Sequence, residues 1–437
     1  MLSAQNRPIT ILLFICILKV FVNSQNYTGP IPKPISGYGA DGTLTVKVDS
    51  IENPAYAGKF IKIHYPTERK GAVPTIFYSH AYGGHDPSSV AGLLNFIAQK
   101  GYAAVFVPYQ TAGITMEYRY NNLINGFALA VKTYKDIIDT TRVGFMGWSF
   151  GGGATIGIGH KFFTENHWGE SGRFLFPLAQ WYSDYVTQEQ LLNFPADTKL
   201  LTIVFDKDDI NDHRMAIDIF NNISIPDSDK DYIRLLQDTV SGYAYVADHS
   251  VPSTRLFDAY DYYAIYRLLD ALCDYTFNKV DSAKNIALGN GSEEQVKMPD
   301  SLHPLIATMH PVPLYPESSY TFPCGGPLNS RRTFCGLTTI SEDADNKETI
   351  NDINHISIYP NPFNPVVTIR SKAVWNKPLL CIYNIHGALI FSEKLNGHAL
   401  RNGIMWNASH YPAGNYLVRI TDEASRPISK LKMILSK

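Results

Sequence analysis

The chain has 437 residues, of which 45% are hydrophobic and 18% are charged. This composition supports a sizeable core and excludes a globally disordered chain, and the length predicts more than one folded unit. The formal net charge is −2 and no long basic run occurs. A nucleic-acid partner is therefore excluded, since nucleic-acid phosphates require a basic face.

The first 24 residues have the pattern of a secretory signal peptide. Arg7 supplies the positive charge, residues 9–22 are largely apolar, and Val22-Asn23-Ser24 offers small residues for cleavage before Gln25. The alternative is a short membrane anchor, but Lys19 interrupts an apolar run that is already too short to span a bilayer comfortably. We expect no stable transmembrane segment elsewhere in the chain, because no other stretch is long and apolar enough.

Two of the five cysteines are candidates for a local disulfide. Cys324 and Cys335 flank the turn-rich Gly325-Gly326-Pro327 in a protein that we expect to be exported. Cys273 and Cys381 lie in runs with the pattern of secondary structure, and we expect both to be buried free thiols.

Residues from about 40 to 310 alternate short apolar runs with longer amphipathic ones. We predict strands at 75–78, 103–107, 142–146 and 200–205, and helices at 89–99 and 118–135. Continuous apolar strands separated by helices predict an α/β fold whose parallel sheet is covered on both faces.

The composition changes after about residue 320. Residues 321–355 are rich in proline, glycine and serine and then in charged residues, which is typical of a linker. Residues 356–437 show alternating strands separated by turns such as Ala413-Gly414-Asn415, and they predict a small all-β sandwich. The expected organisation is a signal peptide at 1–24, an α/β domain at 25–320, a linker at 321–355 and a β unit at 356–437.

The most informative motif is Gly147-Trp148-Ser149-Phe150-Gly151-Gly152-Gly153. It follows an apolar strand and precedes a helical stretch, which is the context of a nucleophile elbow, a sharp turn that exposes a serine hydroxyl. A bare G-x-S-x-G is also found in ordinary glycine-rich turns. The preceding strand and the additional glycines favour Ser149 as a nucleophile.

A serine hydroxyl needs a base to accept its proton and an acid to orient that base, in the chain order Ser, Asp, His. We predict His249 as the base, because it lies in a loop late in the chain before a long helix. The acid should follow the strand at 200–205, where four aspartates compete. We prefer Asp209, with Asp208 second, and interpret Asp206 and Asp212 as solvated loop charges.

A negatively charged oxygen that develops during the reaction needs two backbone N–H donors. One should belong to Phe150, the residue after the candidate nucleophile. The other should come from the loop after the strand at 75–78, and Tyr82 is the candidate.

These segments resemble α/β-hydrolases over about residues 40–300, and the likeness is strongest to the dienelactone-hydrolase-like group and to bacterial cutinases and polyester hydrolases. The resemblance implies a serine hydrolase that cleaves small or polymeric carboxylic esters through an acyl-enzyme, with no cofactor and no metal. It also implies that Trp181 and Tyr82 contact the substrate, although a large aromatic residue such as Trp181 can equally belong to the core. The chain departs from the pattern at Ala81, where glycine is usual, and in the acid loop, which lacks a Val-Pro ending.

The C-terminal unit resembles the C-terminal sorting domain of the type IX secretion system. The likeness rests on its opening run, a central strand motif, a later tryptophan-containing segment and its end: 358–365, 382–387, 403–406, 413–418 and 430–434. It implies that the type IX secretion machinery is a partner and that the protein is secreted or displayed on the cell surface. The alternative is a carbohydrate-binding sandwich, but no exposed aromatic stripe is evident in the sequence.

Two other functions remain open at this point. The first is a peptidase on the same fold, although we find no room for the propeller or clamping insertion that such peptidases often add. The second is a surface adhesin that kept the fold without activity, which the intact Ser, Asp, His order argues against.

Overall fold

The computed structural model describes residues 26–322, except 254 and 300, and residues 356–436, except 362, 372–376, 385–387, 397 and 422–426. The predicted signal peptide, the predicted linker from residue 323 onward and the Cys324–Cys335 pair lie outside the described residues. The chain divides into two compact units, Met1–Thr339 and Ile340–Lys437, which are described separately.

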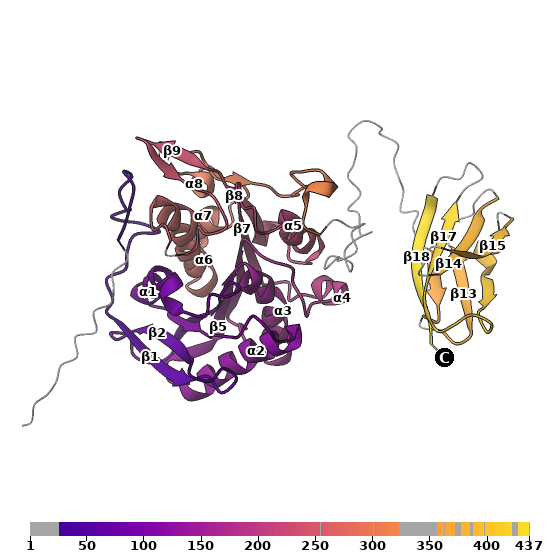
Figure 1. Ribbon diagram of the computed structural model, residues 1–437, viewed down its shortest axis with the longest axis horizontal. Helices are drawn as coiled ribbons and strands as arrows, with labels where there is room; N and C mark the ends of the chain where they lie inside the picture. Colours follow the sequence, from indigo (N-terminus) through magenta and orange to yellow (C-terminus); the bar gives the residue numbers. More distant parts are fainter. Residues whose placement is uncertain are drawn as a thin grey trace, which may run out of the picture. The chain divides into compact units, whose positions relative to one another are not determined.

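The first unit is built on a nine-stranded sheet with the strand order β1-β2-β4-β3-β5-β6-β7-β8-β11 (Figure 1). The strands are β1 Val46–Glu52, β2 Phe60–Pro66, β3 Val73–Ser79, β4 Ala103–Phe106, β5 Ile138–Trp148, β6 Gly172–Leu178, β7 Lys199–Phe205, β8 Lys230–Leu235 and β11 Ile306–Ala307. The six strands from β4 to β8 in this order run parallel, whereas β1, β2 and β11 pair antiparallel at the two edges. We expected a parallel sheet. The central strands confirm this, whereas the strands at the two edges are antiparallel. A separate hairpin pairs β9 Asp238–Val240 with β10 Tyr243–Tyr245.

Burial explains only in part which strands were predicted. Every residue of β3, β4 and β6 is buried, which is the pattern of strands covered on both faces. The four predicted strands are confirmed as β3, β4, β5 and β7. Five strands of this sheet were not predicted: β1, β2, β6, β8 and β11. β1 has no fully buried residue, so its sequence lacks a continuous apolar run, whereas β6 was missed although all of its residues are buried.

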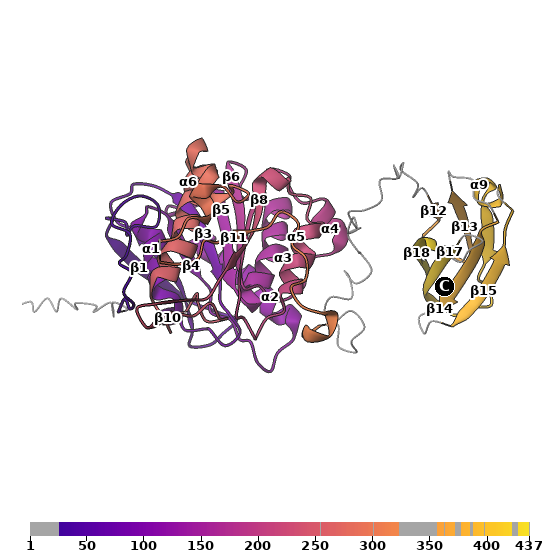
Figure 2. The same ribbon diagram turned by 90° about the horizontal axis from the view of Figure 1, so that it is seen from above.

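Helices cover both faces of the sheet, and two hydrophobic clusters fill the layers between them (Figure 2). One face packs against α1 Ala91–Gln99 and α6 Arg267–Phe277, and the other against α2 Met116–Thr133, α3 Phe150–Glu165 and α5 His213–Asn222. The short helices are α4 Gln188–Leu192, α7 Lys284–Ala287 and α8 Glu293–Val296. In the described part of the chain, no helix combines the length and the apolarity that crossing a membrane requires. Cys273, within α6, is a buried free thiol, as predicted.

The parallel strands place their following loops together. β3, β5 and β7 all run in the same direction, so the segments after Ser79, Trp148 and Phe205 leave the sheet at the same edge. Ligands of open α/β sheets bind outside this carboxyl edge. The segments that carry the predicted site residues are therefore brought to one place by the topology.

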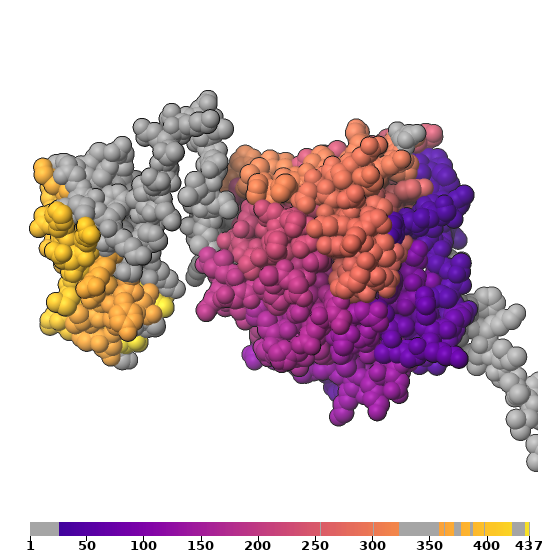
Figure 3. All heavy atoms as spheres, turned by 180° about the vertical axis from the view of Figure 1, so that it is seen from behind, coloured from indigo at the N-terminus to yellow at the C-terminus, as the bar shows by residue number. Residues whose placement is uncertain are grey.

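The first unit extends past the predicted boundary at residue 320. The ring of Phe322 lies 5.0 Å from the ring of Trp181, and the Phe322 amide donates to Asp212 Oδ2 at 3.3 Å. In the space-filling view, the orange surface of the last described residues of this unit is continuous with its body (Figure 3). The composition of residues 321–322 resembles a linker, but their contacts assign them to the folded unit.

The second unit consists of two antiparallel sheets, with the orders β12-β13-β16 and β15-β14-β17-β18. Their bounds are β12 Ile356–Tyr359, β13 Val366–Ser371, β14 Leu379–Asn384, β15 Leu389–Lys394, β16 Ile404–Asn407, β17 Gly414–Thr421 and β18 Pro427–Leu435, with a short helix α9 Ala399–Asn402. Both sheets contribute to one hydrophobic cluster that includes Phe363, Trp406 and Tyr416. This agrees with the predicted all-β unit, and Cys381 on β14 is buried and free, as expected.

Because each unit has its own core, we predict that removing residues 340–437 leaves the first unit folded. The shortened chain should unfold cooperatively, with a midpoint within about 2 °C of the corresponding transition of the full chain. Thermal unfolding followed by circular dichroism checks this, and the loss of a cooperative transition would show that the division is wrong.

Candidate active site

Ser149 occupies a sharp turn between the end of β5 and the start of α3. Its backbone angles are φ 58° and ψ −121°, a conformation that costs a non-glycine residue on the order of 1–3 kcal/mol. Three backbone hydrogen bonds hold it. The Ser149 amide donates to Leu178 O at 2.9 Å, and its carbonyl accepts from Gly153 N at 3.0 Å and from Trp181 N at 2.7 Å. The predicted strand–turn–helix geometry is present, with the serine at the carboxyl edge of the sheet.

Two glycines permit this turn because neighbouring backbone passes very close to them. A Cβ on Gly147 would lie 2.3 Å from Gly151 O, and a Cβ on Gly151 would lie 2.0 Å from Ser79 O. No larger residue fits at either position without moving backbone. The second contact also presses the start of α3 against the end of β3, which brings the turn next to the loop that carries Tyr82.

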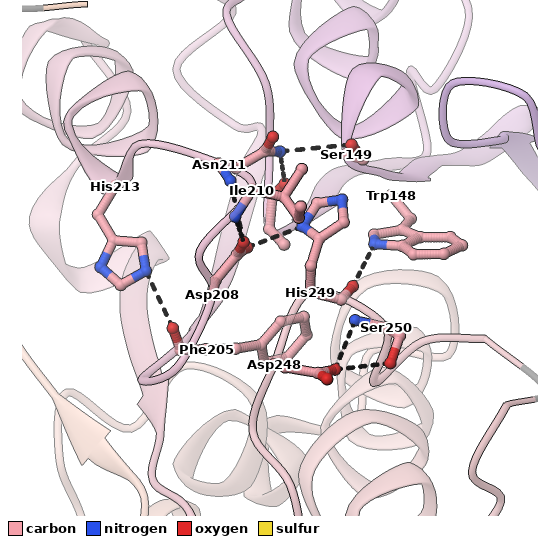
Figure 4. A network of polar contacts seen from close by, with 11 residues as sticks. Trp148, Ser149, Phe205, Asp208, Ile210, Asn211, His213, Asp248, His249 and Ser250 are labelled. Atoms are coloured by element: carbon pink, nitrogen blue, oxygen red, sulfur yellow. Dashed lines mark hydrogen bonds and ion pairs between the residues drawn. The ribbon is translucent and has the colours of Figure 1, made fainter. Parts of the chain in front are cut away.

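His249 is hydrogen-bonded to a buried carboxylate beside the turn. Its Nδ1 lies 2.8 Å from Asp208 Oδ2, and the Asp208 side chain has no exposed surface. Because the carboxylate accepts, Nδ1 carries the proton of the neutral imidazole and Nε2 keeps its lone pair. Figure 4 shows Nε2 on the side of the ring that faces Ser149. Trp148 Nε1 donates to the His249 carbonyl at 2.8 Å and fixes the backbone of this loop.

The preference for Asp209 as the acid is corrected by this geometry, since Asp208 is the residue that contacts His249. Asp208 Oδ1 accepts the amides of Ile210 at 3.0 Å and Asn211 at 2.9 Å. These bonds turn the loop directly after Asp208 and direct its carboxylate inward, whereas Asp209 is exposed. The sequence could not decide between Asp208 and Asp209, because these two amide bonds determine which of the two carboxylates points inward.

The other two aspartates of the loop differ from each other. Asp206 pairs with Lys207 at 3.1 Å near the surface, as expected for a loop charge. Asp212 is 4% exposed and forms the N-cap of α5 by accepting from Arg214 N at 2.9 Å. The prediction that Asp212 is solvated is therefore wrong, because capping a helix buries it.

Backbone bonds join the acid loop to the segment that leads to His249. Asp206 N donates to Leu235 O at 2.9 Å, and Lys207 N donates to Ala247 O at 2.8 Å. These hydrogen bonds hold the acid loop and the segment before His249 side by side. The distance between Asp208 and His249 therefore depends on the backbone as well as on the two side chains.

The loop after β3 is held by His80, which the sequence analysis did not single out. His80 Nδ1 donates to Ala81 O at 2.6 Å, and Nε2 accepts from Tyr109 N at 3.0 Å. Its ring stacks on that of Tyr109 at 3.9 Å. Burial lowers the His80 pKa to about 3, so the ring stays neutral and keeps these roles at neutral pH. Gly83 N donates to Thr111 Oγ1 at 3.0 Å, which secures the other end of the loop.

The amides of Phe150 and Tyr82 are the predicted oxyanion donors. Phe150 is the first residue of α3, where an N–H has no partner within the helix. Within the described ranges, the Tyr82 amide has no acceptor either. The Arg119 guanidinium on α2 links the two residues, with its Cζ 5.4 Å from the centres of both rings. Arg119 therefore helps to hold the Tyr82 loop beside Phe150.

Asn211 is a second residue that the sequence analysis missed. Its Nδ2 lies 3.4 Å from Ser149 Oγ and 2.5 Å from Ala179 O, and the residue is 6% exposed (Figure 4). It connects the acid loop to the serine and to the end of β6. An asparagine three residues after an aspartate carries no recognisable motif, so only the fold reveals it.

Trp181 lies in the loop after β6. Its amide binds the Ser149 carbonyl, and its half-buried ring packs against Phe322 and the adjacent core. The residue thus supports the turn through its backbone. In the described part of the chain, no group of three or more His, Cys, Asp or Glu side chains has the arrangement of a metal site.

Comparison with known proteins bears on the second unit. Residues 357–434 match the family described as the secretion system C-terminal sorting domain, which confirms the prediction from its opening proline-rich run and later strand motifs. No curated protein matches the chain. The chain is therefore exported by the type IX secretion system to the cell surface or the extracellular space, with residues 357–434 as its sorting domain.

Proposed function

We propose that this exported protein is a serine hydrolase of the α/β-hydrolase fold that cleaves carboxylic esters through an acyl-enzyme. One observation carries the proposal: Ser149 sits on a strained strand-to-helix turn beside an imidazole that is hydrogen-bonded to the buried Asp208. The order Ser149, Asp208, His249 along the chain is that of α/β-hydrolases.

In the proposed reaction, Ser149 Oγ attacks the ester carbonyl carbon while His249 Nε2 accepts the hydroxyl proton. Asp208 orients the imidazole through Nδ1–H and stabilises the imidazolium that forms. The imidazolium then gives its proton to the leaving alcohol. Water, activated by the same imidazole, releases the acid from Ser149.

The negative charge on the carbonyl oxygen would be bound by the amides of Phe150 and Tyr82. Each such donor is worth about 3 kcal/mol of transition-state stabilisation in a serine protease. Both amides are positioned before the substrate arrives, since His80 and Thr111 fix the Tyr82 loop and α3 fixes Phe150. A preorganised site avoids the cost of reorienting donors during the reaction.

The surroundings of Ser149 favour an ester with an apolar or aromatic group, either small or polymeric. Tyr82 is 57% exposed, Tyr185 48% and Ile210 57%. They belong to the loops after β3, β6 and β7, which all leave the carboxyl edge of the sheet. Exposed apolar side chains gathered at one edge indicate a binding surface for an apolar ligand.

Ser149→Ala should abolish ester hydrolysis without lowering the midpoint of thermal unfolding. In a serine protease, loss of the nucleophile lowers kcat by about 10⁶-fold, and alanine adopts the same backbone at no greater steric cost. Hydrolysis of p-nitrophenyl butyrate and circular dichroism provide the two measurements. Turnover near that of the wild type would remove Ser149 as the nucleophile, and faster cleavage of peptide anilides than of esters would favour a peptidase.

Asp208→Asn should lower kcat by about 10⁴-fold, as loss of the equivalent charge does in a serine protease. The amide cannot stabilise the imidazolium and can hold the wrong tautomer. Asp209→Asn is the matched control, because it makes the same change one residue away on an exposed side chain, and its kcat should stay near that of the wild type. An impaired Asp209→Asn enzyme beside an active Asp208→Asn enzyme would contradict the assignment.

A further inference from the structure

The last described segment of the first unit, residues 315–322, lies against the acid loop and the start of α5. It follows β11, and Figures 1 and 2 show its orange trace near α5. We call residues 315–322 the strap. The proposed reaction uses none of its side chains, yet its contacts converge on the two loops that flank Ser149.

The first contact is with Arg214, the second residue of α5. The Arg214 guanidinium forms an ion pair with Glu317, and its Cζ lies 4.4 Å from the centre of the Tyr320 ring. The Arg214 side chain is only 12% exposed and Tyr320 is 7% exposed. The Tyr320 hydroxyl accepts from Tyr315 N at 2.9 Å, which closes the strap on itself. The Glu317 side chain is 42% exposed, so the buried guanidinium and its stacking on the buried Tyr320 ring add contacts that an exposed ion pair lacks.

The second contact is with Asp212, the last residue of the acid loop. Asp212 Oδ1 caps α5, and its Oδ2 accepts the amide of Phe322 at 3.3 Å. The preceding residue is Asn211, which reaches Ser149 Oγ and whose amide binds Asp208. A displacement of Asp212 would therefore also displace Asp208, because Asn211 is covalently joined to Asp212 and its amide is hydrogen-bonded to Asp208.

The third contact is with Trp181. The ring of Phe322 meets the ring of Trp181 edge to face, and the Trp181 amide binds the carbonyl of Ser149. Between these contacts, a cavity of about 110 Å³ separates the strap from the acid loop and is lined by Asp208, Asn211 and Ser319, among others. The cavity leaves part of the acid loop without packing against the strap, so the strap adds only a few contacts to the backbone bonds that already hold the start of the loop.

We propose that the strap is a positioning element of the active site, which holds Asp208 against His249 through Arg214 and Asp212. The proposal rests on the hydrolase function proposed above. The strap immediately precedes residue 323, where the chain continues toward the sorting domain. Cleavage before the strap would therefore inactivate the enzyme, whereas release of the sorting domain after it would not.

The chain offers a matched control pair. Arg173 pairs with Asp197 at 3.2 Å, Arg173 is 10% exposed, and its Cζ lies 5.4 Å from the centre of the Phe163 ring. This repeats the buried arginine, exposed carboxylate and aromatic ring of the strap contact. Arg173 lies at the start of β6, at the opposite edge of the sheet from Ser149. Asp197→Asn thus removes an equivalent pair away from the site.

The experiment compares kcat of the full-length Glu317→Gln and Asp197→Asn variants on p-nitrophenyl butyrate, in wild-type and Asp208→Asn backgrounds. Glu317→Gln should lower the wild-type kcat about tenfold, because a displacement of about 1 Å can cost about 100-fold. It should have no further effect in the Asp208→Asn background, because the group on which it acts is already disabled. Asp197→Asn should leave kcat unchanged in both backgrounds. Equal losses from Glu317→Gln in the two backgrounds, or no loss in either, would overturn the proposal.

Hydrogen–deuterium exchange separates failure of the strap proposal from failure of the proposed function, because it needs no substrate. Glu317→Gln should speed amide exchange in residues 206–212, and Asp197→Asn should not. Phe322→Ala, which removes the third contact, should speed exchange in the same residues. Unchanged exchange in residues 206–212 would overturn the proposed role of the strap, even if the protein hydrolyses esters. If exchange became faster but the wild-type protein had no esterase activity, the strap would still be shown to hold the acid loop, and the proposed function would be rejected.

Discussion

The close approach of three backbone segments at Ser149 is the constraint on which the rest of the site depends. The serine can hold its positive φ only because Gly147 and Gly151 let β5, α3 and the end of β3 come within van der Waals contact. The same contact places the Tyr82 loop beside Phe150. A strained residue persists only where its surroundings over-determine it, and here Leu178, Gly153 and Trp181 supply the bonds that do so.

The remaining parts of the proposed site follow from the parallel sheet. β3, β5 and β7 bring the Tyr82 loop, Ser149 and Asp208 to one edge of the sheet, and the bond from Lys207 N to Ala247 O holds the His249 loop beside them. Buried polar residues then fix each loop. His80 holds the first, Asn211 joins the acid loop to the serine, and Asp212 ends that loop as a helix cap. The proposed chemistry is thus positioned mainly by backbone contacts and by hydrogen bonds of buried polar side chains.

The sequence predicted the parts of the fold and the site that have a local signal. Buried apolar runs revealed β3, β4, β5 and β7, and the glycine pattern identified the turn at Ser149. The edge strand β1 has no continuous apolar run and was missed, and the fully buried β6 was missed as well. The choice of Asp208 over Asp209 depends on two amide bonds within a turn, which the sequence does not reveal. Asn211 and His80 were missed because their contacts are with residues distant in the sequence. Composition assigned residues 321–322 to a linker, although Phe322 packs on Trp181, because a contact across more than 100 residues has no local signature.

The most direct test of the proposed function is to locate a covalent adduct after treatment with a fluorophosphonate, which reacts with activated serines. Peptide mapping by mass spectrometry of the full-length protein identifies the modified residue. We expect one phosphonylated residue, Ser149, and much slower labelling when Asp208 is replaced by asparagine, since the hydroxyl is then poorly activated. Absence of an adduct, or an adduct on another serine, would contradict the proposal that Ser149, His249 and Asp208 form a catalytic triad.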